Sequence, residues 1–420
     1  MHAEANHVFP IEEMLGVYLS IPFCRAKCTY CNFASGVHGV EQHARYVDRL
    51  CADLRGARAR AEALGAVLPN TIGSVYLGGG TPSLLDPALL RRIFKSLRGE
   101  FALDADAEIT VECAPGQIEG AFLKVMVEVD VGRVSLGVQS FVDAEARATG
   151  RFHNCADVLA DIARLRGAGI RSVNVDLIAG LPRQTLDSWR ESLEALAASA
   201  VDHASLYMLE VDEDSRLGRE LIGGGVRYGA GLVPMEDAIA EMYEQGCALL
   251  DASGLMQYEI SNFAQPGAQS RHNLRYWRRQ PYLGVGLDAH SMLRRTDGGA
   301  VRFGATDDLD AYLRGAGEGA ADVLTGGAEL EEAWFLGLRL NAGVSREALV
   351  GEFGGEAVAR FDPVVDAMCG EELLVRVGGR IALTERGRML SNDVFARFLD
   401  IDEGARVALS DCAGDPAVVA

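Results

Sequence analysis

The sequence contains no run of roughly 18 consecutive apolar residues, the length that a membrane-spanning helix requires. Its first apolar run is preceded by no basic region and carries Glu12 and Glu13, unlike a secretory signal peptide. Positive charge is also in short supply, because 60 acidic residues against 40 basic ones give a formal charge of -20. Non-specific binding to nucleic acid needs a basic surface, so nucleic acid is not an expected partner. We expect a cytoplasmic protein.

A disulfide framework is not indicated either, since the nine cysteines are odd in number and thinly spread outside one cluster. In that cluster, "SIPFCRAKCTYCNF", Cys24, Cys28 and Cys31 have the spacing C-x3-C-x2-C, and Phe33 follows instead of a fourth cysteine. No histidine is close enough in sequence to complete a tetrahedral zinc site. Three thiolates can hold three irons of a 4Fe-4S cluster and leave the fourth iron open.

A repeated strand-then-helix pattern organises the first half of the chain. Short apolar runs at 16–21, 74–80, 108–114, 133–139, 172–178 and 203–209 are typical of strands. Helical periodicity marks the segments at 47–64, 86–97, 155–169 and 186–199. Near-continuous apolar strands favour a parallel sheet, and six such units predict a partial (β/α)6 barrel of the α/β class.

Polar residues stand at the carboxyl ends of these expected strands. Tyr18 lies in the first strand, "GGGTP" from Gly78 to Pro82 follows the second, and Glu112, Gln139 and Asp176 end the next three. The glycines permit close approach of the backbone to a ligand, although a tight turn explains them equally well. Buried polar groups are costly unless they are paired or bind something. We therefore predict a binding site on the rim that also carries the cysteines.

These motifs resemble the radical S-adenosylmethionine superfamily, in which C-x3-C-x2-C follows a first strand and GGGTP follows a second. The stretches "YLSIPFC", "YLGGGTPS", "LGVQSF", "NVDLIAGLP" and "YEISNFA" are similar to its coproporphyrinogen-oxidase-like branch, which includes the HemN oxidases and the HemW haem chaperones. The resemblance runs from about Gly16 to Leu399. It implies a 4Fe-4S cluster held by Cys24, Cys28 and Cys31, with S-adenosylmethionine on the open iron and reductive cleavage to a 5'-deoxyadenosyl radical. The residues that it assigns to S-adenosylmethionine or the adjoining site are Tyr18, Tyr30, Gly79, Gly80, Thr81, Glu112, Gln139, Arg151 and Asp176. Cys113 stands where an asparagine is expected.

Two features separate the members of this branch. The resemblance implies a fourth cysteine in the oxidases at the position of Phe33, and an N-terminal extension that the roughly fifteen residues before Gly16 are too few to supply. Both favour a haem chaperone over the alternative, an oxygen-independent coproporphyrinogen III oxidase. A third hypothesis, a radical enzyme acting on RNA, is disfavoured by the charge. The expected partners are haem, haem-accepting proteins such as those of respiratory membranes, an electron donor, and a second copy of the chain.

A second motif lies in "SRHNLRYW", where His272, Asn273, Tyr276 and Trp277 resemble the H-N-x-x-Y-W haem motif of HemW. Imidazole is a common axial ligand of haem iron, and aromatic rings can pack on the porphyrin. Seven arginines lie at or near it and could pair with propionates: Arg271, Arg275, Arg278, Arg279, Arg294, Arg295 and Arg302. The alternative interpretation is a loop whose histidine and tryptophan are structural. His290 in "GLDAHS", near Asp288, is a second candidate iron ligand, for which a structural role is favoured.

The C-terminal part is expected to form a separate module. Residues 331–340 are typical of an amphipathic helix, and 372–384 of two strands about a turn at Gly378 and Gly379. One further helix is predicted over 385–399. These elements suggest a winged-helix-like domain that packs against the rest or contacts a partner. The expected divisions are a barrel at 1–215, an extension with the haem motif at 216–325, this module at 326–400 and a tail at 401–420.

Overall fold

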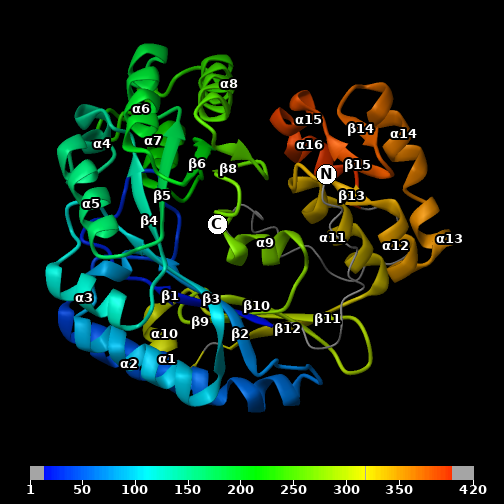
Figure 1. Cartoon of the computed structure of the whole chain (residues 1–420), viewed down its shortest axis with the longest axis horizontal. Helices are drawn as coiled ribbons and strands as arrows, with labels where there is room; N and C mark the ends of the chain where they lie inside the picture. The colour runs from blue at the N-terminus through cyan, green and yellow to red at the C-terminus, as the bar shows by residue number, and fades with distance from the viewer. Residues whose placement is uncertain (1–13, 317, 400–420) are drawn as a thin grey trace.

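The computed structural model describes residues 14–316 and 318–399. Its largest feature is a 12-stranded sheet with the strand order β12-β11-β10-β9-β1-β2-β3-β4-β5-β6-β8-β7. Figure 1 shows this sheet curving with helices on its outer side, while the C-terminal elements form a second body at the right. The predicted tail at 401–420 lies outside the described residues.

The centre of the sheet is the expected parallel barrel. Its strands are β1 (Leu15–Ile21), β2 (Thr71–Gly79), β3 (Ala102–Cys113), β4 (Arg133–Gln139), β5 (Ser172–Ala179) and β6 (His203–Met208). Each of them pairs in parallel with the next. The helices between them are α1 (Val40–Ala63), α2 (Pro87–Glu100), α3 (Gly120–Glu128), α4 (Asp143–Ala148), α5 (Cys155–Gly167) and α6 (Leu186–Ser199). The predicted α/β class and partial barrel are confirmed.

The helix α2 illustrates how the sequence builds these units. Asp86 accepts a hydrogen bond of 2.7 Å from the backbone N of Ala88, and Pro87 occupies the first helical position. Leu90, Ile93, Phe94 and Leu97 recur at helical spacing and are buried against the sheet, because that spacing places them on one face.

Alternation along the strands separates the core from the barrel interior. In β1, Val17, Leu19 and Ile21 belong to the main apolar core, so the intervening Tyr18 and Ser20 face the other way, into the barrel. The same alternation turns Tyr76 of β2 inward, since it lies directly opposite Tyr18 in the register. The inner surface of the barrel is therefore polar and the outer surface apolar.

Both edges of the sheet extend beyond the six predicted units. On one side β9 (Tyr282–Val285) pairs in parallel with β1, and three antiparallel pairings add β10 (His290–Arg294), β11 (Ala300–Ala305) and β12 (Glu318–Leu324). On the other side β8 (Asn262–Ala264) and β7 (Met256–Gln257) follow β6. Strands β7 to β10 have only two to five residues, and β9, β11 and β12 each contain a glycine, so these segments carry little strand periodicity.

The segments that connect the strands contain four further helices and two 3₁₀ turns: α7 (Arg216–Gly223), α8 (Glu236–Ala252), α9 (Arg271–Trp277), α10 (Leu309–Leu313), η1 (Pro82–Leu84) and η2 (Ala230–Leu232). Within the part of the chain that is described, no helix is long and apolar enough to cross a membrane.

The C-terminal part has its own apolar core, in which Trp334 stacks on Phe361 and Phe398 at centroid distances of 5.8 and 5.2 Å. Its elements are α11 (Gly326–Arg339), β13 (Val344–Ser345), α12 (Arg346–Phe353), α13 (Gly355–Ala359), α14 (Asp362–Gly370), β14 (Leu374–Val377), β15 (Arg380–Leu383), α15 (Glu385–Met389) and α16 (Ser391–Ala396). The single helix predicted over 385–399 is wrong, because the backbone leaves helical geometry at Leu390 and α16 starts anew there. The proposed domain divisions stay a prediction.

Candidate functional site

The cysteine loop follows β1 at the carboxyl end of the parallel strands. Cys24, Cys28 and Cys31 are each partly buried and free of disulfides. The backbone N of Cys24 donates to the carbonyl of Gly36 at 2.8 Å, which folds the loop back on itself. Burial raises the pKa of the Cys24 and Cys31 thiols, so a cationic partner is needed to hold them as thiolates.

The three cysteines suit a cluster better than a single ion. Among the residues described, no set of three His, Cys, Asp or Glu side chains is placed to hold one metal ion. In a 4Fe-4S cube each cysteine binds a different iron, so the three sulfurs do not have to converge on one point. The donor set therefore fits a cluster with one open iron.

Arg151 provides positive charge beside this loop. Its Nη2 donates to the Tyr30 hydroxyl at 3.2 Å, and its charge acts on Cys28 and Cys31. On the other side of the loop, Lys27 Nζ donates to the carbonyl of Phe33 at 2.9 Å. An arginine among thiols favours their ionised form and compensates in part for the negative charge that a bound cluster would carry.

The GGGTP segment packs directly on the end of β1. Gly80 N donates to Ile21 O at 2.9 Å and Thr81 N to Phe23 O at 2.8 Å. A Cβ at Gly80 would lie 2.7 Å from the Ile21 carbonyl, and Gly79 has a φ of +97°. The glycines thus let this segment pack closely against the end of β1 and the start of the cysteine loop.

Glu112 links this segment to the barrel interior. Its Oε1 accepts a hydrogen bond of 2.9 Å from the Tyr76 hydroxyl, and its Oε2 accepts one of 3.2 Å from Gly79 N. Burial, and next the nearby Asp176 carboxylate, raise the pKa of Glu112 to about 7. Cys113, the next residue, points the opposite way into the apolar core, so its replacement of an expected asparagine does not reach this site.

Asp176 and Gln139, with Glu112, line the polar inner surface of the barrel, which we call the polar wall. Asp176 accepts hydrogen bonds of 3.0 Å from Ser135 Oγ and 2.7 Å from Asn174 Nδ2, while burial raises its pKa. Gln139 has a φ of +69°, a left-handed conformation that is strained for a side chain of this kind. Its Oε1 and the Nε of Arg151 are buried without a hydrogen-bond partner among the described residues. Unpaired polar atoms at this wall are groups that a polar nucleotide can satisfy.

The structure therefore brings the predicted rim residues together, with Tyr18 beside Tyr76 at a ring-centroid distance of 6.1 Å. Tyr76 itself was not among the predicted site residues. Its position two residues before Gly78 places it on the inward face of β2, and this alternation is the signal that could have found it.

His272 lies deep in the fold, with only 1% of its surface exposed. Its Nδ1 is 2.9 Å from Ser74 Oγ and its Nε2 is 2.9 Å from the Tyr276 hydroxyl. Burial, and next the charge of Arg275, lower its pKa to about 3, so the imidazole is neutral. Both ring nitrogens are in use, and ligation of an iron by His272 would require one of these hydrogen bonds to break.

The other three motif residues are buried as well: Asn273, Tyr276 and Trp277. The guanidinium group of Arg339 lies over the Trp277 ring at 4.2 Å, and the ring of Tyr276 meets that of Tyr282 edge-on at 4.6 Å. The backbone N of His272 donates to Glu108 Oε1 at 2.9 Å, and Glu108 lies in β3 opposite Ser74 of β2. The helix α9 thus closes the end of the barrel opposite the cysteine loop.

Three of the seven arginines near this motif, Arg279, Arg294 and Arg302, pair with carboxylates from the C-terminal part. Arg279 pairs with Glu352 at 2.9 Å and with Glu329 at 3.4 Å. Arg302 pairs with Glu332 at 3.0 Å. Part of the basic segment that the sequence suggests for propionates is therefore an internal ion-pair network, because acidic residues distant in sequence fold onto it.

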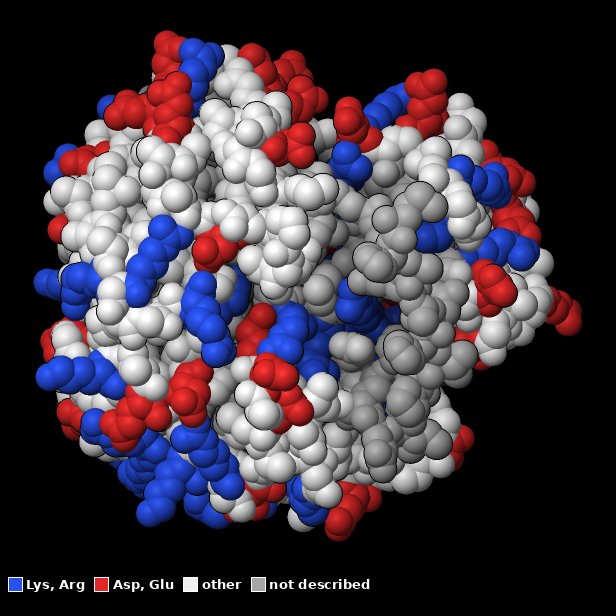
Figure 2. All heavy atoms as spheres, in the orientation of Figure 1, with Lys and Arg blue, Asp and Glu red and all other residues white. Residues whose placement is uncertain are grey.

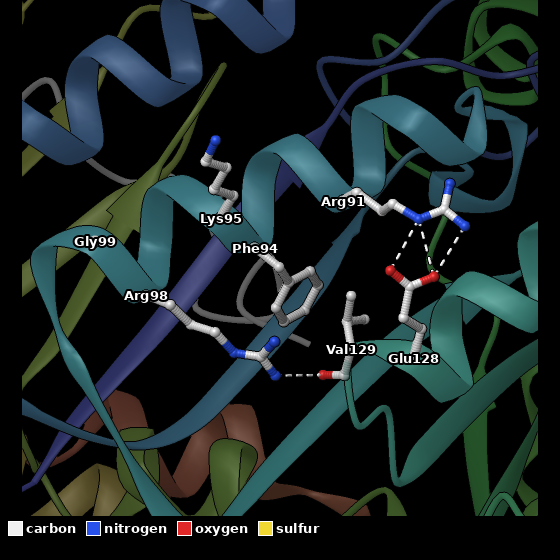
Figure 3. A pocket seen from close by; sticks show the side chains of 7 residues that line it. All are labelled: Arg91, Phe94, Lys95, Arg98, Gly99, Glu128 and Val129. Atoms are coloured by element: carbon white, nitrogen blue, oxygen red, sulfur yellow. Dashed lines mark hydrogen bonds and ion pairs between the residues drawn. The ribbon is translucent and has the colours of Figure 1, made fainter.

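A surface groove of about 410 Å³ between α2 and α3 lies away from these residues. Figure 3 shows that Arg91 and Arg98 reach across it to Glu128 and the Val129 carbonyl, whereas Lys95 points away. Figure 2 shows basic side chains gathered at the lower left of the molecule, where α1 and α2 lie in Figure 1, with acidic ones among them. The guanidinium groups in the groove are already paired, so this surface offers no preformed anion site.

Comparison with known proteins agrees with this architecture. The family model described as "Radical SAM superfamily" matches residues 18–196, and the "HemN C-terminal domain" model matches residues 324–390. The heme chaperone HemW of Lactococcus lactis is 30% identical over 385 residues, which cover 91% of this chain and 96% of that protein. HemW of Escherichia coli is 32% identical over 389 residues, covering 92% and 98%.

The chain belongs to the HemW family of radical SAM proteins. Membership implies a 4Fe-4S cluster and S-adenosylmethionine, and the cysteine loop and polar wall fit both. The fold is shared with a solved structure of HemN, the coproporphyrinogen III oxidase of Escherichia coli, at a TM-score of 0.79 and 23% identity over 92% of this chain and 90% of that one. At this identity the likeness concerns the fold, whereas the HemW relatives carry the family.

Proposed function

We propose that the chain is a haem chaperone of the HemW type, which binds a 4Fe-4S cluster, S-adenosylmethionine and haem and delivers haem to haem-dependent proteins. The observation that carries the proposal is the match to chaperones named HemW over more than 90% of the chain. The cysteine loop is consistent with it, since Phe33 stands where the oxidases of this branch are expected to have a fourth cysteine.

In this proposal Cys24, Cys28 and Cys31 hold the cluster, and Arg151 stabilises their thiolates. Bound S-adenosylmethionine supplies a sulfonium group that the reduced cluster can cleave. The GGGTP backbone would border its methionine part, and Glu112 and Asp176 would be available to accept hydrogen bonds from its adenosyl part. Gln139 and Arg151 offer it the unpaired atoms described above.

The haem role of His272, Asn273, Tyr276 and Trp277 stays a prediction, and the geometry attaches a condition to it. The imidazole can reach haem only if α9 moves or rearranges, because both of its nitrogens are bonded inside the barrel. The identity of the haem acceptor and of the electron donor also belongs to the proposal.

The alternative is an oxygen-independent coproporphyrinogen III oxidase, the activity for which the solved HemN structure of the same fold is named. To separate the two, the cluster is reconstituted anaerobically and the protein is titrated with haem in one sample and incubated with coproporphyrinogen III, S-adenosylmethionine and a reductant in another. Stoichiometric haem binding without vinyl product supports the chaperone. Turnover that requires S-adenosylmethionine supports the oxidase instead.

The cluster assignment is tested by Cys28→Ala, with Cys155→Ala as the matched control outside the loop. We expect Cys28→Ala to abolish the visible absorption of the reconstituted cluster, because two thiolates cannot hold three irons. Cys155→Ala should retain it. A Cys28→Ala variant that keeps a full cluster would contradict the assignment.

A further inference from the structure

His203 is a buried histidine that the proposed function does not use. It begins β6, is fully enclosed, and has Asn174 of β5 as its register partner. Register partners share a face of the sheet, and so do residues two apart on one strand, which places His203, Asn174 and Asp176 on the same face. Because Asp176 belongs to the polar wall, His203 also points into the barrel, beside a residue assigned to S-adenosylmethionine.

The amide group of Asn174 connects His203 to Asp176. Its Nδ2 lies 2.7 Å from Asp176 Oδ1, and its Oδ1 lies 2.7 Å from His203 Nδ1. An ionised carboxylate only accepts hydrogen bonds, so the amide nitrogen must face Asp176 and the amide oxygen must face His203. The imidazole therefore carries its proton on Nδ1 and donates it to Asn174.

Tyr258 holds the other side of the imidazole ring. Its hydroxyl lies 2.9 Å from His203 Nε2, and burial, then the charge of Arg133, lower the pKa of His203 well below its ordinary value. A neutral ring with its proton on Nδ1 can only accept at Nε2, so the Tyr258 hydroxyl donates to it. The Tyr258 oxygen in turn accepts from the backbone N of Ser270, the residue that caps α9, at 3.2 Å. The contacts on both sides thus fix the ring in one tautomer and one orientation.

Neighbouring groups do not duplicate the role of His203. The Ser205 hydroxyl lies 3.3 Å from Asn174 Oδ1 and 2.9 Å from Asn262 Oδ1, and its single proton can be given to only one of them. The shorter contact is the one to Asn262. Asn174 is only 2% exposed, so water is poorly placed to replace a lost donor. His203 is therefore the donor that fixes the amide group of Asn174.

We propose that His203 is a positioning residue for S-adenosylmethionine, which holds the Asp176 carboxylate in place through Asn174. The proposal rests on the role that the proposed function gives to Asp176. This carboxylate accepts at Oδ1 from Asn174 and at Oδ2 from Ser135, and each oxygen keeps a further lone pair for the adenosyl part. Without the donor at His203 the amide group is free to rotate, and the carboxylate loses its fixed orientation.

The test uses two substitutions that separate the ring nitrogens. In His203→Asn the amide nitrogen takes the place of Nδ1 and can still donate to Asn174, whereas in His203→Gln it takes the place of Nε2. Anaerobic equilibrium dialysis measures the affinity of the full-length, cluster-reconstituted protein for S-adenosylmethionine. We expect His203→Gln to bind about three- to tenfold more weakly, because it loses the donor to Asn174. His203→Asn should stay within about twofold of wild type, since it retains that donor.

A double-mutant cycle with Asp176→Ala separates positioning from a general loss of structure. Asp176→Ala alone should weaken binding by about tenfold or more, the equivalent of a hydrogen bond to a charged group. If His203 acts through Asp176, adding His203→Gln to Asp176→Ala causes no further loss of affinity. Fully additive losses would mean that His203 acts by another route and would overturn the proposal.

The outcomes distinguish this proposal from the function on which it rests. If the wild-type protein binds no S-adenosylmethionine, or if Asp176→Ala binds it normally, the proposed nucleotide site itself fails. If Asp176→Ala weakens binding and His203→Gln does not, the site stands and the positioning role is overturned. A His203→Asn variant that binds as weakly as His203→Gln overturns it as well. Retained cluster absorption shows that a variant is folded, and if His203→Gln loses it, Asn174→Ser, which removes the connecting amide, takes its place with the same expected loss and the same cycle.

Discussion

The ring of Tyr76 stacks on the ring of His272, with centroids 5.3 Å apart and planes inclined by 29°. The Tyr76 hydroxyl at the same time donates to Glu112, whose other oxygen accepts from Gly79 N. Tyr76 therefore contacts the helix that closes the barrel and, through Glu112, the loop proposed to border the nucleotide. Through this contact, displacement of α9 would disturb the residues assigned to S-adenosylmethionine.

Tyr76→Phe isolates the polar half of this link. The phenyl ring keeps the stack on His272, but Glu112 loses the donor that helps hold it in place. We expect S-adenosylmethionine to bind about three- to tenfold more weakly, the equivalent of one ordinary hydrogen bond, with cluster content unchanged. Equilibrium dialysis measures the affinity. Tyr312→Phe, which loses a bond to Asp53 away from the site, is the control and should bind normally.

The raised pKa of Glu112 predicts a pH dependence of stability. Its folded pKa of about 7 exceeds the ordinary value of 4.5, so the folded state binds more protons than the unfolded state between these values. The contribution of this group to stability therefore falls as pH rises from 4.5 through 7 and stays low above 7. Glu112→Gln removes the ionisation. We measure the urea midpoint of the variant minus that of the wild type. We expect this difference to be more favourable to the variant at pH 8 than at pH 5. A pH-independent difference would contradict the raised pKa.

His272 and His290 should differ in their effect on stability. His272→Leu leaves the buried hydroxyls of Ser74 and Tyr276 without their imidazole partner, and should cost about 2–4 kcal/mol of unfolding free energy. The exposed His290→Ala should stay within about 0.5 kcal/mol of wild type. Urea denaturation of both variants checks the contrast. Equal losses of unfolding free energy in the two variants would mean that the hydrogen bonds of His272 to Ser74 and Tyr276 do not stabilise the fold.

Gly73, which lies against Arg275 of α9, provides a test of how closely α9 packs on the barrel. A Cβ on Gly73 would lie 2.5 Å from Nη2 of Arg275, whereas one on Gly99 meets nothing within 4 Å. Gly73→Ala should destabilise the protein by about 1–3 kcal/mol because the guanidinium group must shift. Gly99→Ala, near the end of α2, should be neutral or stabilising by up to about 1 kcal/mol. A neutral Gly73→Ala would show that α9 is held less closely than described.

Much of the barrel could be predicted from the sequence because each unit carries its own periodicity. The strand at 133–139 and the helix at 186–199 coincide with β4 and α6 residue for residue. The cysteine loop and the GGGTP segment are also local patterns, so their place at the strand ends follows from chain order. Strands β7 to β10 have only two to five residues, and the pairings that join them to the barrel, β9 with β1 and β8 with β6, connect segments distant in sequence.

The placement of α9 depends on tertiary contacts in the same way. The H-N-x-x-Y-W pattern shows which residues come together, but not that Ser74 and Tyr276 would occupy both nitrogens of His272. The arginines near it look free in the sequence because Glu329, Glu332 and Glu352 follow only after some 30 to 70 residues. Solvent exposure of His290 is likewise a property of the folded sheet and has no local signal.

Haem transfer is the measurement that tests the central claim most directly. The cluster-reconstituted protein is loaded with one equivalent of haem, freed of excess, and mixed under anaerobic conditions with an apo-haem protein, while the acceptor's absorption spectrum is followed. The haem chaperone account predicts that the acceptor becomes loaded as this chain loses haem, without vinyl product when coproporphyrinogen III is supplied instead. Haem that is never bound, together with turnover of coproporphyrinogen III, would contradict it.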